Sequence, residues 1–350
     1  MKIVILAGGL SPERDVSLTS GSLIANALRE AGHHVLLLDV YEGIPSFDSS
    51  NIEYLFEDAG GTPYSYSVPD VEPDLDEIKK RNNNGDSLIG PHVLEICKHA
   101  DIVFLALHGA MGENGQIQAV FDVMGIRYTG TGYIGSLLAM DKDISKKMMQ
   151  QAGVPTAEWS VFTGDSLDPQ NVINRVGLPC VVKPCSCGSS IGISMADTYE
   201  ELKAAIAAAK KIEPMVLVEK RISGREFSVG VLGGRALPVI EIIPDEGFYD
   251  YRNKYQKGRT KEICPAQLSD AETGRVQALA LKVHEVLRLG TYSRIDFILN
   301  EENGEFVCLE ANTLPGMTPT SLIPQEALAD GISYMELCNL IVQLSLNKCR

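Results

Sequence analysis

The chain has 350 residues, of which 45% are hydrophobic and 22% are charged, a composition typical of folded globular proteins. Its 31 basic and 46 acidic residues give a formal net charge of −15. This charge argues against nucleic acid and anionic membranes as partners, because both require a basic surface. A chain of this length is also expected to form two or three subdomains rather than one core.

The sequence shows no sign of export or membrane insertion. The apolar run at the N-terminus lacks the basic flank and cleavage site of a signal peptide, and no stretch approaches 18 uncharged apolar residues. The eight cysteines are scattered without a CxxC pair, so neither a zinc site nor a disulfide framework is predicted. We therefore expect a cytoplasmic protein with reduced thiols.

The N-terminal third has the pattern of an α/β domain. Residues 2–7 form a β-type run, a turn at Gly8-Gly9 follows, and apolar spacing then predicts a helix. A second β-type run covers residues 101–107. This alternation predicts a parallel sheet with helices on its faces. Residues 45–91 between these runs are rich in Ser, Asn, Asp, Pro and Gly, which predicts an irregular surface insertion.

The remaining chain predicts two further sheets. A helix starting near Met140 leads out of the first domain. Two strands, 179–183 and 215–220, then enclose an Ala-rich helix, and a larger sheet is expected from residue 225 onward.

Polar residues two positions apart mark a hairpin near the C-terminus. They are Arg294 and Asp296 on one strand and Glu310 and Asn312 on the next. A three-residue loop with Gly304 in the left-handed region would place Asp296 opposite Glu310 on one face. Opposed carboxylates repel unless a hard cation lies between them, so the spacing predicts a metal site. The alternatives are a two-residue loop, which would scatter these groups, and an ordinary solvated strand edge.

Two glycine-rich segments are candidates for phosphate contact. A buried strand ends at Lys183 and continues into a loop of small residues, 185–193, whose N–H groups could approach phosphate oxygens. A plain flexible loop is the alternative. Residues 130–135 match GxGxxG, but no acidic residue follows at the spacing of a dinucleotide site, which favours a packing turn. The connector around Ile222 could bind an adenine edge, or it could simply close a hairpin.

Together these motifs resemble the D-alanine–D-alanine ligases of the ATP-grasp superfamily, over nearly the whole chain except residues 45–91. The segments that carry the resemblance are 8–18, 107–115, 128–132, 140–142, 182–184, 188–190, 248–255, 294–296 and 309–322. The resemblance implies an α/β (α+β) fold of three subdomains. These are an N-terminal parallel-sheet substrate domain (1–138), a central subdomain with the phosphate loop (139–222), and a C-terminal subdomain with the metal site and a mobile loop at 248–265 (223–350). It also implies a homodimer.

The resemblance further implies roles for individual residues. The implied cofactors are ATP and two Mg²⁺ or Mn²⁺, with Asp296, Glu310 and Asn312 as metal ligands. The implied ATP-binding residues are Lys142, Lys183, Glu219, Lys220, Ile222, Glu226 and Lys254. The implied catalytic residues are Glu13, Ser189, Tyr255, Arg294 and Gly316. The implied substrate-binding residues are Glu13, His108, Ser321 and Leu322.

The implied reaction joins two D-alanines through an acyl phosphate, for peptidoglycan precursor synthesis. Alternatives are D-serine or D-lactate as the second substrate, a regulatory ATP-binding module without catalysis, and a dinucleotide-dependent oxidoreductase. By the resemblance, Tyr255 fits a dipeptide-forming enzyme and Leu322 argues against D-serine. Cys185 and Cys187 depart from the family pattern, which has a more polar run there.

Overall fold

The computed structural model describes residues 1–48, 50, 52–57, 61–69, 73–82, 84–188, 192–244 and 260–347. Ser189, Lys254 and Tyr255, which the sequence assigned to the site, lie outside the described residues. Most of the expected mobile loop, residues 248–259, also lies outside them.

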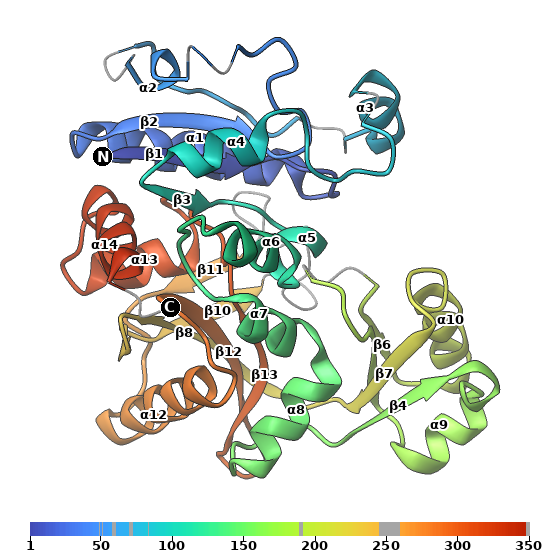
Figure 1. Cartoon of the computed structure of the whole chain (residues 1–350). Coiled ribbons are helices and arrows are strands. Elements are labelled where there is room, and N and C mark those ends of the chain that lie inside the picture. The colour runs from blue at the N-terminus through green and yellow to red at the C-terminus, as the bar shows by residue number, and fades with distance from the viewer. Residues whose placement is uncertain are drawn as a thin grey trace.

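The N-terminal sheet is parallel, as predicted, with the order β2-β1-β3 (Figure 1). Its strands are β1 (Lys2–Ala7), β2 (His34–Asp39) and β3 (Ile102–Leu105). Alternate residues of β1 enter two cores. Ile3 and Ile5 pack with α1 (Arg14–Glu30), whereas Val4 and Leu6 pack with the helices on the opposite face. Burial on both faces explains why β1 reads as a continuous apolar run.

The insertion between the first strands is largely irregular, with two short helices, α2 (Tyr54–Glu57) and α3 (Leu75–Asn82). Side chains tether it to α1. Asn26 donates to the Tyr64 carbonyl (2.8 Å) and accepts from the Tyr64 N–H (3.0 Å). The Tyr66 hydroxyl donates to Asp15 at 2.5 Å.

Helix α4 (Val93–His99) precedes β3 and packs on the N-terminal sheet. The short helices after β3, which lead to the rest of the chain, are α5 (Ala110–Glu113), α6 (Gln116–Met124), α7 (Tyr133–Met140) and α8 (Lys142–Gln151). The helix expected near Met140 is α8, and Asp141 caps it by accepting from the Ile144 N–H at 2.9 Å. The GxGxxG segment is a close packing turn, since a Cβ on Gly135 would lie 2.5 Å from the Arg288 carbonyl oxygen.

The central sheet is antiparallel, with the order β4-β7-β5-β6. Its strands are β4 (Trp159–Thr163), β5 (Cys180–Pro184), β6 (Ser194–Ala196) and β7 (Met215–Lys220). The 3₁₀ turn η2 (Gly164–Ser166) follows β4, and helices α9 (Pro169–Arg175) and α10 (Tyr199–Ala209) pack on the apolar residues of the sheet.

The C-terminal sheet is also antiparallel, with the order β11-β10-β8-β12-β13. Its strands are β8 (Gly224–Leu232), β9 (Arg235–Ala236, paired with β8), β10 (Ile240–Pro244), β11 (Thr260–Ile263), β12 (Tyr292–Asn300) and β13 (Phe306–Asn312). The helices are α12 (Asp270–Val286), α13 (Leu322–Ala329) and α14 (Tyr334–Leu346). Because β11 is a strand, residues 260–263 are not part of a loop, contrary to expectation.

Elements that are far apart in the sequence pack together in the same hydrophobic cores. Leu337 and Ile341 of α14 share a core with β1 and α1 of the N-terminal domain, and Figure 1 shows α14 beside that domain. Ala139 of α7 and Met149 of α8 share a core with the C-terminal sheet. The hydrophobic cores therefore contain residues from more than one predicted domain, and the domain limits at residues 138 and 222 remain predictions. No helix within the described ranges is long and apolar enough to cross a membrane.

Candidate active site between the three sheets

Two cavities meet where the three sheets approach one another, and together they contain most of the predicted site residues. The first, here the amino-acid cavity, is lined by the predicted residues Glu13, His108, Lys142, Arg294, Glu310, Asn312 and Gly316. The second, here the nucleotide cavity, is lined by the predicted residues Lys183, Glu219, Lys220, Ile222, Glu226, Asp296 and Glu310. Glu310 lines both cavities.

The β12–β13 hairpin produces the predicted pairing by a different route. Arg294 pairs with Asn312 and Asp296 with Glu310, as expected from a three-residue loop. Nearer the turn, however, the register differs by one residue, and Gly304 (φ +69°) ends a four-residue loop. A β-bulge at Leu309 restores the pairing. Leu309 and Glu310 consequently both line the nucleotide cavity.

Asp296 is the centre of a buried hydrogen-bond network. Arg294 donates to both of its oxygens, at 3.0 Å from Nε and 2.7 Å from Nη2. The Ser228 hydroxyl donates at 2.8 Å and the Asn312 amide at 3.0 Å. Ser228 was not predicted. It stands opposite Asp296 on β8, and a pairing between strands so far apart in sequence has no short-range signal.

Glu310 differs from Asp296, because no hydrogen bond or ion pair to its carboxylate occurs in the described part of the chain. Within the same ranges, no three acidic, His or Cys side chains gather around one point. The predicted metal cluster thus consists of two opposed carboxylates and one amide.

A second buried charge network lines the nucleotide cavity. Glu219 is paired with Lys183 and, at 2.8 Å, with Lys146, which also donates to Thr156 at 2.6 Å. Burial acts against the charge of Glu219, but the two lysines outweigh it and lower its pKa to about 2. Burial lowers the pKa of Lys146, whereas in Lys183 the attraction of Glu219 outweighs burial and raises the pKa. Lys146 was not predicted as a site residue.

The connector around Ile222 does not close a hairpin. Strand β7 belongs to the central sheet and β8 to the C-terminal sheet, so residues 221–223 pass from one sheet to the other. Exposed Lys220 and half-buried Ile222 and Glu226 line the cavity at this crossing. The alternative of a plain hairpin is therefore wrong.

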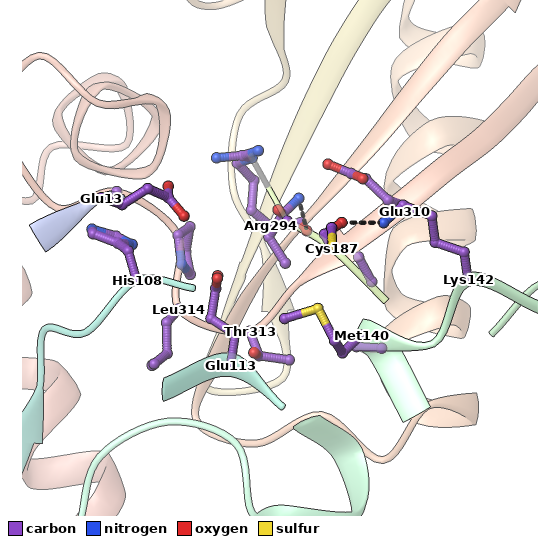
Figure 2. A pocket seen from close by; sticks show the side chains of 16 residues that line it. Glu13, His108, Glu113, Met140, Lys142, Cys187, Arg294, Glu310, Thr313 and Leu314 are labelled. Atoms are coloured by element: carbon purple, nitrogen blue, oxygen red, sulfur yellow. Dashed lines mark hydrogen bonds between the residues drawn. The ribbon is translucent and has the colours of Figure 1, made fainter. Parts of the chain in front are cut away.

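Lys142, at the start of α8, holds the small-residue loop that follows β5. Its N–H donates to the Cys185 carbonyl at 3.0 Å, and its Nζ donates to the Cys187 carbonyl (Figure 2). Cys185 is buried, whereas Cys187 lines the amino-acid cavity. Burial raises the pKa of both thiols, which keeps them protonated.

Glu13 and His108 lie on one side of the amino-acid cavity, opposite Arg294, Lys142 and Glu310 (Figure 2). Burial lowers the pKa of His108 despite nearby Glu13, so the imidazole is neutral. Its Nε2 is buried and has no hydrogen-bond partner among the described residues. A buried ring nitrogen without a partner is costly unless a ligand supplies one.

Glu113, the last residue of α5, lines the same cavity but was not assigned a role from the sequence. Its Oε2 accepts from the Gly109 N–H at 2.8 Å. The only sequence signal was its place in the segment 107–115, where several polar residues follow a buried strand.

The segment after β13 contains the remaining predicted residues. Gly316 lines the amino-acid cavity, and a Cβ there would lie 2.9 Å from the Ser321 hydroxyl. Ser321 accepts from the Thr318 N–H at 3.1 Å. Leu322 is buried against Ile240 and Ile242, so its side chain packs in the core rather than in either cavity.

Comparison with known proteins places this architecture in a single family. Residues 2–131 match the family model described as D-ala D-ala ligase N-terminus, and residues 148–343 match the one described as D-ala D-ala ligase C-terminus. The chain is 43% identical to D-alanine–D-alanine ligase of Pediococcus pentosaceus, covering 98% of this chain and 97% of the relative. It is 39% identical to that of Halalkalibacterium halodurans, covering 99% and 100%.

Solved structures agree with the sequence comparison. D-alanine–D-alanine ligase from Bacillus anthracis superposes with a TM-score of 0.75 at 29% identity, covering 99% of this chain and 98% of that one. A second structure from the same organism, complexed with ATP, superposes with a TM-score of 0.74 at 26% identity and the same coverage.

Proposed function

Because the chain belongs to the D-alanine–D-alanine ligase family, we propose that its two cavities divide between them one reaction, the ATP-dependent joining of two D-alanines. The observation that carries this proposal is the position of Glu310 on the wall shared by the two cavities. A phosphoryl group that is transferred from a nucleotide in one cavity to an amino acid in the other must cross the boundary between the two cavities, where Glu310 lies. Synthesis of this dipeptide for peptidoglycan follows from the family's role.

The nucleotide cavity fits ATP and a divalent cation. Asp296 and Glu310 stand directly opposite each other, and Arg294 pairs with Asp296 but not with Glu310 among the described residues. Glu310, without a partner in the described part of the chain, and the adjacent Asn312 amide offer the oxygen donors that Mg²⁺ prefers. Two Mg²⁺ held by Asp296, Glu310 and Asn312 would supply positive charge that offsets the charge of the phosphates.

We assign the remaining nucleotide contacts by charge and position. Lys142 and Lys183 would contact the phosphates, and Lys254 of the segment outside the described residues would contact the γ-phosphate. Adenine and ribose would meet the connector between the sheets, through Glu219, Lys220, Ile222 and Glu226. The low pKa of Glu219 keeps it an acceptor throughout the neutral range.

The amino-acid cavity would bind both D-alanines. Buried Glu13 would accept the ammonium group of the first, next to neutral His108, with Ser189 and Tyr255 completing a hydrogen-bonded triad. Ser321 and Leu322 would contact the second. Since the Leu322 side chain packs in the core, its contact with a substrate would come from the backbone.

The reaction then proceeds in two steps. A carboxylate oxygen of the first D-alanine attacks the γ-phosphorus and ADP leaves, which produces an acyl phosphate. The amine of the second attacks the acyl carbon, and inorganic phosphate leaves. Arg294 and the Gly316 N–H would stabilise the oxyanion between these events. Exclusion of water by the segment 248–259 would protect the acyl phosphate from hydrolysis.

An assay of phosphate release from ATP tests the proposal. D-alanine, D-serine and D-lactate are supplied in turn, each with D-alanine as first substrate, and the products are identified by mass. We expect D-alanyl-D-alanine as the main product. Absence of release that depends on an amino acid would refute the ligase assignment, and preferential incorporation of D-serine or D-lactate would refute the assigned second substrate.

We also propose a homodimer in a cytoplasmic setting. Val123, Tyr133, Ile134 and Leu137 on α6 and α7 are exposed apolar side chains, which supports a contact with a second copy. The seven described cysteines are free thiols, which fits a reducing compartment. Light scattering coupled to size exclusion tests the dimer, and a monomeric mass at micromolar concentration would refute it.

A further inference from the structure

Glu113 is an acidic group in the amino-acid cavity that the reaction above does not use. It shares the cavity with Glu13, Arg294 and Gly316, and Figure 2 shows its carboxylate directed toward the space between His108 and Arg294. One oxygen accepts from the Gly109 N–H at 2.8 Å. The other has no hydrogen-bond partner among the described residues.

The surroundings of Glu113 make it a stronger base than an ordinary carboxylate. Burial raises the pKa of Glu113 to about 8, the negative charges of Glu13 and Glu310 add to this effect, and the Gly109 hydrogen bond and Arg294 act against it. A carboxylate with such a pKa can accept a proton at neutral pH, since general bases are most efficient when their pKa lies near the working pH.

The second half of the reaction needs such a base. An amino acid arrives as an ammonium ion, which has no lone pair with which to attack the acyl phosphate. Lys142 and Arg294 are cations and cannot accept its proton. Glu13 must stay ionised to hold the first ammonium group, and Glu310 is a proposed metal ligand. His108 is neutral, but burial lowers its pKa and makes it a weak base.

We propose that Glu113 accepts the proton that the ammonium group of the second D-alanine loses before attack. The inference rests on the proposed function. The N–H bond breaks and its proton joins a carboxylate oxygen of Glu113. The freed electron pair forms the C–N bond to the acyl carbon. The C–O bond to phosphate then breaks, and the second proton on nitrogen leaves with inorganic phosphate. Glu113 later returns its proton to water.

The test separates the two halves of the reaction. Hydroxylamine is a neutral nucleophile at neutral pH and traps an acyl phosphate as a hydroxamate without needing a base. In Glu113→Gln, the side-chain oxygen can still accept from Gly109, but the side chain cannot take up a proton. We expect dipeptide formation to fall about 100-fold or more, while D-alanine hydroxamate formation from ATP, D-alanine and hydroxylamine stays within about threefold of wild type.

Each other outcome has a defined meaning. Unchanged dipeptide formation overturns the proposal. Equal loss of both products also overturns it, because Glu113 would then serve the first step or the shape of the loop. Wild-type protein that forms neither product counts against the proposed function instead. Glu302→Gln, which changes an exposed acid in the hairpin loop, is the matched control and should leave both rates unchanged.

A measurement on wild-type protein keeps the proposal testable should Glu113→Gln fail to fold. The ratio of dipeptide to hydroxamate should rise with pH and level off above about 8, because Glu113 is ionised there. A ratio that keeps rising in proportion to the free-amine fraction of D-alanine up to pH 9 would overturn the proposal.

Discussion

Several charged side chains of the nucleotide cavity are buried, so the free-energy cost of burying each charge depends on whether an opposite charge lies beside it. Glu219 is 3% exposed and lies between two lysines. Removing one partner from a buried ion pair typically costs about 3–5 kcal/mol, because the remaining charge stays buried without compensation.

Lys146→Met should therefore destabilise the protein by about 3 kcal/mol and raise the KM for ATP more than it lowers kcat, since Glu219 would lose its anchor. The neighbouring Lys147 is the matched control, because its own side chain is exposed, although its partner Asp143 is partly buried, and surface ion pairs contribute about 0–1 kcal/mol. Denaturant unfolding and steady-state kinetics measure both effects. Similar results for Lys146→Met and Lys147→Met would contradict this account.

Glu326 of α13 should make stability depend on pH. Its Oε2 accepts from the Gly230 N–H at 2.6 Å, while Oε1 is buried without a partner among the described residues. Burial raises the pKa of Glu326 well above its usual value. A group with a raised folded-state pKa is most stabilising below its ordinary pKa, and it loses this contribution as pH rises toward the raised pKa.

Glu326→Gln keeps the hydrogen bond but cannot ionise. We expect its melting temperature to exceed that of wild type increasingly between pH 6 and pH 9, as measured by calorimetry in matched buffers. A constant difference across this range would show that Glu326 does not titrate on folding.

The sequence reveals single residues at this site only where a short motif contains them. Arg294 and Asp296 are two positions apart, and Lys183 is the penultimate residue of β5, so strand periodicity and position indicate them. Lys146 becomes a site residue only because Glu219, more than 70 positions later in the chain, folds against it. Long-range pairing of this kind cannot be read from local spacing.

Helix α8 is the element that connects the two cavities, since Lys142 lines one and Lys146 supports the other. Its first turn is fixed by the Asp141 cap. Loss of an N-cap acid typically costs about 0.5–2 kcal/mol.

Asp141→Ala should cost about 1 kcal/mol of stability and also raise the KM for ATP, because α8 positions lysines at the nucleotide. Asp168→Ala is the matched control. Asp168 caps α9 by the same interaction at 3.1 Å, and neither cavity includes α9. It should cost similar stability with an unchanged KM. Equal kinetic effects of the two changes would refute the positional role of α8.

The β12–β13 hairpin shows how a correct pairing can be predicted from an incorrect turn. The assumption of a three-residue loop placed Asp296 opposite Glu310, and the structure pairs these two residues although its loop has four. The four-residue loop and the bulge at Leu309 compensate for each other. A bulge has no distinctive sequence signal when its extra residue is an ordinary apolar one, so the bulge at Leu309 could not be predicted from the sequence.

At the scale of the whole molecule, both cavities are lined by residues from more than one sheet unit, so ligands should hold these units together. The strand pattern predicted three sheets but not that α14 would return to the N-terminal domain or that α7 and α8 would pack on the C-terminal sheet. Where these helices pack depends on which apolar surfaces of the sheets remain exposed after the sheets have formed, and local sequence patterns do not show this.

A non-hydrolysable ATP analogue with Mg²⁺ should stabilise the protein by about 2.7 kcal/mol at 100 times its Kd, seen as a rise in melting temperature. Glu310→Gln should abolish turnover and most of this rise, while the unliganded protein melts near the wild-type temperature. An active variant that still responds to Mg²⁺ would contradict the role given to Glu310.

The shared position of Glu310 has a thermodynamic consequence. A ligand in either cavity alters the field and the solvation of the same carboxylate, so the two binding equilibria cannot be independent. Linkage then requires reciprocity: whatever factor the nucleotide contributes to the affinity for D-alanine, D-alanine must contribute to the affinity for the nucleotide. Cooperativity between substrates would thus follow from one common side chain, without any movement transmitted between domains.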